Sequence, residues 1–376
     1  MSMQSRCKQF IENILAACLM ASLFAVPVAA QEGPSAQYRG LQTLDIPFAN
    51  GAIAMRHVPQ VWLRLPGGAP HRFGMDTGST GIVVAAEHYT PGPGDVSDGP
   101  GRLVYNSSGR VLTGERYTTN VVIQRDEATP VATARVQVLR VTEITCLEHA
   151  RDCRPEHRPR GVAFMGVGFA RGSAQRTDDT APRNPFTNLV SLASGAPLSS
   201  VRPGYIVTRE GVHLGMSAER TRNFAFVKLA PGASSQAGVP GWGATPMTVM
   251  VDGIGGHGAV LVDTGINYMF LSPPEGTRLA RGMHAPAGTR IGLFMPDHRN
   301  PPAVYYGFTV GARDNPMQPE RVEVVRDPGV FVNTGRMFLE GFDYLYDAAG
   351  GYVGFGWNGR LRGTYGTATP GLYQAP

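Results

Sequence analysis

The sequence predicts an all-β protein with two related lobes, on the strength of three observations. The 376 residues include 48 glycines and 30 prolines, a composition that favours short strands and many turns over long helices. From Leu41 onward, short apolar segments alternate with turn residues. The tripeptide Asp-Thr-Gly occurs twice, at Asp76–Gly78 and Asp263–Gly265, and the 187-residue interval is about the length of one domain. A single Asp-Thr-Gly would be explained as an ordinary turn between strands. Two copies in matching apolar surroundings indicate two lobes that each contribute one carboxylate to a shared site.

The first thirty residues are typical of an export signal. Arg6 and Lys8 provide a positive start, an apolar core covers residues 14–28, and small residues end at Ala30. We expect cleavage after Ala30, with lipidation at Cys18 and an uncleaved anchor as the alternatives. No later segment is long and apolar enough to span a bilayer. The predicted mature protein is therefore soluble, free of the membrane, and periplasmic or secreted.

The charge pattern argues against nucleic-acid binding. The formal net charge is +5, and nearly every cation is an arginine, since Lys8 and Lys228 are the only lysines. Codon usage in a GC-rich genome explains this bias, and selection of arginine for phosphate or carboxylate recognition is the alternative. The sequence contains neither long basic blocks nor basic residues interleaved with aromatic ones, so we expect no nucleic-acid partner.

Two cysteines remain after the signal, Cys146 and Cys153. In an oxidising compartment the expected state is a disulfide that closes a small loop. The alternative is a zinc site completed by His149 and His157. Nearby prolines indicate an irregular loop and favour the disulfide, so no metal is expected.

The first half of the chain after the signal is expected to consist mainly of strands. A β-hairpin is predicted over Gly101–Ile123, with its turn at Asn106–Gly109. An apolar strand is predicted within Arg160–Gly172, where glycines permit close backbone approach. An exposed loop over Ser173–Pro185 and a short helix over Thr187–Ala193 complete this half.

The second half repeats the pattern. A strand, a glycine-rich turn at Gly253–Gly258 and a second strand lead to Asp263, and His257 in the turn is expected to be exposed. A turn at Ala348–Gly351 separates two apolar strands. The tail over residues 364–376 is rich in glycine, threonine and proline and is expected to be loose.

Taken together, these residues resemble the pepsin-like aspartic proteases. Besides the two Asp-Thr-Gly segments, Tyr105 and its hairpin resemble the flap that closes over substrate in that family. Phe164–Gly166 resembles the strand that crosses behind the first catalytic loop, and Gly335–Phe355 resembles the family's C-terminal helical turn and hairpin. The similarity extends over about Leu41–Gly363 and is that of an exported member of bacterial type.

The resemblance implies a bilobal pepsin-like acid protease fold, with an active-site cleft between two related β lobes. The implied N-terminal lobe covers residues 31–205 and carries Asp76 and the flap. The implied C-terminal lobe covers residues 206–363 and carries Asp263, and the tail follows from residue 364.

The resemblance also implies an aspartic endopeptidase that hydrolyses peptide bonds with two carboxylates and one water. Two carboxylates a few ångströms apart cannot both ionise, so they hold one proton between them. We expect Asp76 to be the base that activates water and Asp263 the acid that protonates the substrate carbonyl. The family pattern gives supporting roles to Thr77, Gly78, Ser79, Thr264 and Gly265. No cofactor is implied, and we expect a monomer that binds a peptide or protein substrate.

The sequence departs from the family pattern at three places. A serine or threonine usually follows each Asp-Thr-Gly and donates to the aspartate, a role that Ser79 fits and Ile266 cannot fill. Loss of this donor should leave Asp263 the more easily protonated partner and extend activity to less acidic pH. Val83 stands where the family has the tryptophan that pairs with the flap tyrosine, and Asn333-Thr334 stands where two apolar residues are expected.

Two alternatives to the protease remain at this point. A catalytically silent pepsin-like binding or inhibitor module is favoured by the departures and opposed by the intact aspartates and threonines. The other alternative is an unrelated two-lobed β protein in which the two Asp-Thr-Gly segments are turns that match by coincidence. In such a protein the two carboxylates need not lie within ~4–6 Å of each other. Motifs of zinc proteases, serine hydrolases and phosphate-binding loops do not occur.

Overall fold

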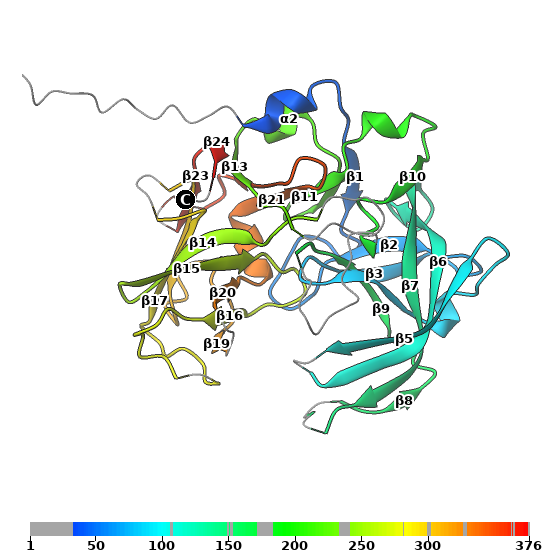
Figure 1. Ribbon diagram of the computed structural model, residues 1–376, viewed down its shortest axis with the longest axis horizontal. Helices are drawn as coiled ribbons and strands as arrows, with labels where there is room; N and C mark the ends of the chain where they lie inside the picture. The colour runs from blue at the N-terminus through cyan, green and yellow to red at the C-terminus, as the bar shows by residue number, and fades with distance from the viewer. Residues whose placement is uncertain are drawn as a thin grey trace, which may run out of the picture. The chain divides into compact units, whose positions relative to one another are not determined.

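Strands dominate the computed structural model, which confirms the predicted all-β class (Figure 1). The structure describes residues 33–105, 108–148, 150, 153–170, 183–232, 241–280, 282–298, 302–325, 329–361, 363 and 365–374. They belong to one compact unit, Glu32–Pro376. The predicted export signal with Cys18 lies outside the described residues, as do His149 and most of the predicted loop Ser173–Pro185.

A nine-stranded sheet comes entirely from the first half of the chain. Its order is β10 (Leu189–Leu192), β7 (Pro130–Cys146), β4 (Thr80–Ala85), β9 (Ala163–Val167), β3 (His71–Asp76), β2 (Gln60–Arg64), β6 (Arg110–Gln124) and β5 (Val96–Tyr105), with β8 (Glu156–His157) paired to β7. The first Asp-Thr-Gly starts at the end of β3, inside this sheet.

An eight-stranded sheet comes entirely from the second half. Its order is β19 (Val322–Val324), β16 (Met269–Ser272), β20 (Val330–Asn333), β15 (Ile254–Leu261), β14 (Thr245–Val251), β17 (Arg290–Met295), β18 (Val304–Thr309) and β23 (Gly366–Ala368). The second Asp-Thr-Gly lies between β15 and β16.

A seven-stranded sheet joins the beginning, middle and end of the described chain. Its order is β1 (Leu44–Pro47), β12 (Gly211–Leu214), β11 (Gly204–Val207), β21 (Phe342–Asp347), β22 (Tyr352–Trp357), β13 (Phe224–Lys228) and β24 (Gly371–Tyr373). The expected lobe boundary between residues 205 and 206 falls inside β11, so the division of the chain at that point stays a prediction.

The described helical segments are short. They are η1 (Pro34–Tyr38), η2 (Ala86–His88), η4 (Leu198–Ser200), α2 (Ala218–Thr221) and η5 (Arg336–Glu340). Within the described part of the chain, no helix has the length and apolar character needed to cross a membrane.

The nine- and eight-stranded sheets share one strand order. Six neighbouring strands run β7-β4-β9-β3-β2-β6 in the first sheet and β19-β16-β20-β15-β14-β17 in the second. In each, the strand before the aspartate pairs in parallel with a third strand, β9 or β20, and the strand after the aspartate pairs antiparallel with the same one. The two Asp-Thr-Gly segments therefore occupy equivalent places in two related β units.

The orientation of Asp76 follows from the alternation of side chains along β3. Phe73 and Met75 are fully buried and point into the core from one face of the strand. Arg72, Gly74 and Asp76 consequently share the opposite face, since successive side chains alternate. A shift of one residue would bury the carboxylate in the apolar core, and pairing with β2 and β9 on both sides of β3 fixes the register.

Two predicted hairpins are confirmed. β5 pairs with β6 up to Tyr105 and Arg110, so the strands of the predicted flap are present, although Asn106 and Ser107 of its turn lie outside the described residues. β21 pairs with β22 across the predicted turn at Ala348–Gly351.

Three local predictions are wrong. Thr187–Ala193 contains no helix, because its residues form β10 and cover an edge of β7 that would otherwise be open. The turn before Asp263 is confined to Asp252 and Gly253, and the glycines after it belong to β15, where His257 is exposed as expected. Residues 366–368 and 371–373 of the C-terminal tail are not loose, because β23 and β24 pair with β18 and β13.

Candidate active site

The two Asp-Thr-Gly loops are in direct contact. Asp263 lies close enough to Asp76 for the charge of Asp76 to raise the pKa of Asp263. A Cβ atom on Gly78 would overlap the carboxylate of Asp263, and a Cβ atom on Gly265 would crowd the carboxylate of Asp76. Each carboxylate thus faces the glycine of the opposite loop, and only a residue without a side chain fits there. This contact argues against the alternative of an unrelated β protein, in which the two Asp-Thr-Gly segments would be separate turns.

Thr77 and Thr264 bind the loops to each other in a reciprocal brace. The backbone N–H of each threonine donates to the Oγ1 atom of the other, and both distances are 3.0 Å. Thr77 Oγ1 then donates to the Val262 carbonyl and Thr264 Oγ1 to the Met75 carbonyl, at 2.7 Å each. Both threonines are buried with these groups satisfied, so the brace fixes the separation of the aspartates that flank it.

Backbone groups hold the inner oxygen of each carboxylate. Gly78 N–H donates to Asp76 Oδ1 at 2.6 Å, and Gly265 N–H donates to Asp263 Oδ1 at 2.7 Å. The hydroxyl of Ser79 donates to the outer oxygen, Asp76 Oδ2, at 2.6 Å. These are the contacts that the resemblance implies for the first loop.

Asn333 supplies the outer contact in the second loop. Its Nδ2 donates to Asp263 Oδ2 at 2.6 Å, the same distance as the bond that Ser79 makes to Asp76. Its Oδ1 accepts from the N–H of Gly335 at 3.0 Å, which orients the amide with its nitrogen toward the carboxylate. The expectation that Ile266 leaves Asp263 without an outer donor is therefore wrong.

The register of β20 explains how Asn333 reaches the carboxylate. Asn333 pairs with Leu261 of β15 and Phe270 of β16, as Phe164 pairs with Gly74 and Val83 in the other sheet. Phe164 and Asn333 are thus equivalent positions, one apolar and one amide. The sequence indicated this donor only through the polar Asn333 at a position where the family pattern has an apolar residue.

Burial is the main cause that raises the pKa of Asp263, and the charge of Asp76 and the hydrogen bond with Asp76 raise it further, to about 8. The hydrogen bonds from Asn333 and Gly265 lower this pKa, because they favour the ionised form. The effects that raise the pKa of Asp263 outweigh those that lower it. We therefore place the proton that the two carboxylates share on Asp263.

Arg336 is a buried cation behind the second loop that the sequence analysis did not single out. It is 4% exposed, and its guanidinium donates to the carbonyls of Thr264, Ala54 and Met55 at 3.1–3.3 Å. Burial lowers the pKa of Arg336, while the charge of Asp263 counteracts that effect. Its position ties the segment at Ala54 and Met55 to the second loop, and its charge favours a negative charge on the carboxylate pair.

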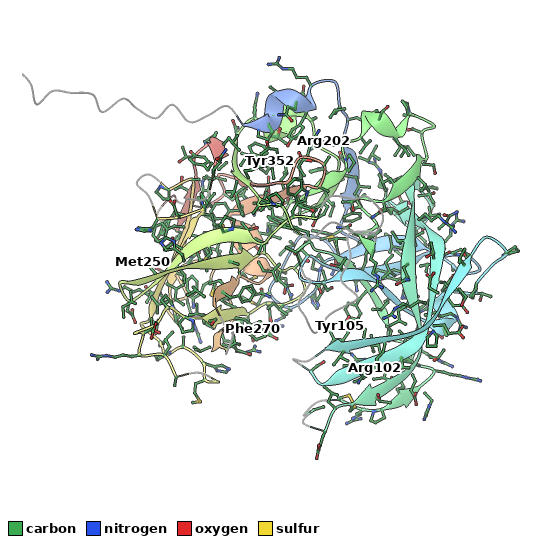
Figure 2. All side chains as sticks on the ribbon, in the orientation of Figure 1. Arg102, Tyr105, Arg202, Met250, Phe270 and Tyr352 are labelled. Carbon is green, nitrogen blue, oxygen red and sulfur yellow. A yellow bond between two sulfur atoms is a disulfide. The ribbon has the colours of Figure 1, made fainter. Side chains whose placement is uncertain are left out.

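Tyr105 lies at the turn end of the hairpin formed by β5 and β6 (Figure 2). It lines a small cavity of about 20 Å³ together with Ser79, Val83 and Phe164. Val83, at the position where the resemblance implies a tryptophan, therefore lies beside the same cavity as Tyr105.

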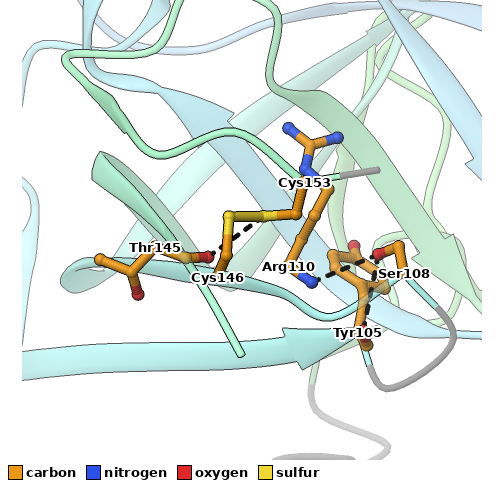
Figure 3. Close-up of a disulfide and its surroundings, with 6 residues drawn as sticks. All are labelled: Tyr105, Ser108, Arg110, Thr145, Cys146 and Cys153. Atoms are coloured by element: carbon orange, nitrogen blue, oxygen red, sulfur yellow. Dashed lines mark hydrogen bonds between the residues drawn. A yellow bond between two sulfur atoms is a disulfide. The ribbon is translucent and has the colours of Figure 1, made fainter. Parts of the chain in front are cut away.

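A disulfide lies beside the turn end of this hairpin. Cys146 and Cys153 are bonded, which confirms the predicted disulfide, and Cys146 pairs with Arg110 of β6 (Figure 3). Leu147 N–H donates to the Gly109 carbonyl at 2.8 Å. The cross-linked loop therefore holds the strand that follows the turn. The described residues contain no cluster of three or more potential metal ligands.

Comparison of the chain with models of known protein families gives no match, and comparison with curated proteins gives none either.

Proposed function

We propose that the protein is an aspartic endopeptidase. The observation that carries this proposal is the reciprocal threonine brace, which holds the two loops so that each carboxylate packs against the glycine of the opposite loop. Asp76 takes a proton from a bound water that attacks the peptide carbonyl, and Asp263 gives its proton to the carbonyl oxygen. The raised pKa of Asp263 supports this assignment of roles, because the acid must keep its proton until the carbonyl oxygen becomes charged.

The same proposal covers the substrate and the compartment. An extended peptide or protein segment binds under the hairpin that carries Tyr105, and the protein acts as a monomer without a cofactor. The disulfide is typical of proteins that fold in an oxidising compartment and supports export to the periplasm or the medium.

A catalytically silent binding module is the second candidate. Ile266 offers no donor to Asp263, and Asn333-Thr334 replaces an apolar pair with polar residues. The bond from Asn333 to Asp263 weakens this alternative, since an inactive site has no need for a second carboxylate held by a donor of its own.

The test is cleavage of a random peptide mixture by the purified exported protein across pH 3 to 7, with cut sites read by mass spectrometry. Asp76→Asn and Asp263→Asn should each abolish cleavage. Asp252→Asn, which changes an exposed carboxylate at the turn between β14 and β15, is the matched control and should leave it unchanged. Cleavage that survives in both active-site variants would refute the proposal, and absence of any cleavage would favour the binding module.

A further inference from the structure

An open cavity of about 640 Å³ near the candidate active site is lined mainly by nitrogen-bearing side chains. This volume is within the range of pockets that hold ligands. Arg56, His57, His71 and Arg72 contribute to the lining, and the described lining residues include no carboxylate. The cavity therefore presents the permanent positive charges of two arginines and the ring nitrogens of two histidines.

The cavity lies on the side of the first sheet, next to the small cavity beside Ser79 and Tyr105. Phe164 lines both this cavity and the small one that Tyr105 and Ser79 line. Arg72 shares a face of β3 with Asp76 and stands four residues before it. At about 3.3 Å per strand residue, the two positions are about 13 Å apart, which is the length of roughly four residues of an extended peptide.

The segment with Arg56 and His57 is fixed to the second loop. Arg336 donates to the carbonyls of Ala54 and Met55, directly before that segment, and also to the carbonyl of Thr264. This anchor connects one wall of the cavity to the backbone beside Asp263. The cavity is thus attached to both catalytic loops, through β3 on one side and Arg336 on the other.

The two arginines of the cavity form no ion pair with the described residues. Arginines elsewhere pair with acids, as in Arg202 with Asp347 and Arg209 with Glu340. Arg56 and Arg72, in contrast, have no ion-pair partner in the described part of the chain. The guanidinium of Arg72 lies 5.7 Å from the ring centre of Trp62, which limits the freedom of its side chain. Unpaired cations around one concave surface attract an anion more strongly than isolated surface arginines do.

We propose that this cavity is a subsite for an acidic side chain of the substrate, roughly four residues from the bond that is cut. The inference rests on the proposed protease function and adds the substrate class, which is an extended acidic peptide. The guanidinium groups of Arg56 and Arg72 bind the carboxylate, with hydrogen-bond support from His57.

The experiment compares cleavage of a random peptide mixture at low salt and about pH 5.5, where peptide carboxylates are largely ionised. Three proteins are used: the wild type, the double variant Arg56→Gln/Arg72→Gln, and Arg290→Gln as control. Arg290 is an exposed arginine on β17 of the eight-stranded sheet and does not line this cavity. In the wild type and the control, we expect Asp and Glu to be enriched at one position about four residues from the cut.

The double variant should lose this enrichment and still cut peptides. For a matched pair of peptides that differ by Glu or Gln at that position, the wild-type preference in kcat/KM should be about five- to tenfold and should fall to about one in the double variant. Cleavage without acidic enrichment in the wild type, or enrichment that persists in the double variant, overturns the subsite and leaves the protease proposal intact.

A binding measurement separates this inference from failure of the protease proposal. If the wild type cuts nothing, fluorescence anisotropy of a short labelled peptide with two glutamates is compared with its glutamine counterpart on the same three proteins. Tighter binding of the acidic peptide that is lost only in the double variant supports the anionic subsite. Equal binding of both peptides by the wild type overturns it.

Discussion

Replacement of Asn333 by leucine tests whether its amide tunes the proposed acid. Leucine has similar volume and offers no donor, so the variant removes the 2.6 Å bond to Asp263 Oδ2. That bond favours the ionised carboxylate, and its loss should make Asp263 hold its proton more tightly. The bell-shaped pH dependence of kcat/KM should then extend upward, because its basic limb reports the loss of the last proton from the pair.

The size of the shift follows from the strength of the bond. A hydrogen bond to a charged group contributes about 1.5–3 kcal/mol, and one pKa unit corresponds to about 1.4 kcal/mol. The basic limb should therefore move up by about one to two pH units. The variant also leaves the N–H of Gly335 without the Asn333 Oδ1 acceptor, so we expect a loss of about 1–3 kcal/mol in stability as a separate effect.

The assay is kcat/KM for one fluorogenic peptide from pH 3 to 9, with thermal unfolding to show that the variant is folded at each pH. Ser79→Ala is the matched control, because Ser79 donates to Asp76 at the same distance. Ser79 contacts the proposed base and not the proposed acid, so this control should leave the basic limb in place. A basic limb that stays fixed or moves downward in Asn333→Leu would refute the reasoning.

Two further predictions concern stability. The native pKa of Asp263, about 8, exceeds the ordinary value near 4, so the native state holds a proton that the unfolded state has lost. Asp263 should therefore contribute a fall in stability of about 1.4 kcal/mol per pH unit as pH rises between these values. Burial also raises the pKa of Asp343, to about 7, so urea unfolding of Asp263→Asn should show a smaller slope and not a flat profile, and an unchanged slope would contradict the assignment. Thr77→Val leaves the Val262 carbonyl and the Thr264 N–H unpaired in a buried place, and should cost roughly 2–5 kcal/mol. A loss under about 1 kcal/mol would mean that the brace is not a principal support of the loops.

Features encoded in local sequence were predicted well. The paired Asp-Thr-Gly segments lie in apolar runs, and buried residues at the ends of β3 and β15 lead into them. The hairpin at Tyr105 and the turn at Ala348–Gly351 are marked by residues with known turn chemistry. The proximity of the two cysteines in the chain made the disulfide the simplest outcome.

Features that depend on distant pairing were predicted poorly. β10 and β24 are short segments whose strand conformation comes from partners far away in the sequence, β7 and β13. A short segment with weak local preference takes the conformation that its neighbours can pair with. Arg336 was missed for a related reason, since its partners at Ala54 and Met55 lie more than 280 positions earlier in the chain.

The contact between Asn333 and Asp263 shows why a missing residue in a motif does not establish a missing interaction. The first loop takes its outer donor from Ser79, three residues after Asp76, on the loop itself. The second takes it from β20, 70 residues beyond Asp263, at the position where the first sheet has Phe164. The equivalent strand position therefore has different roles in the two units. In the first unit the apolar Phe164 lines the cavities, and in the second the polar Asn333 donates to the carboxylate. Since β20 is paired on both sides, its amide is held more rigidly than a loop hydroxyl, and the second carboxylate keeps a fixed donor despite Ile266.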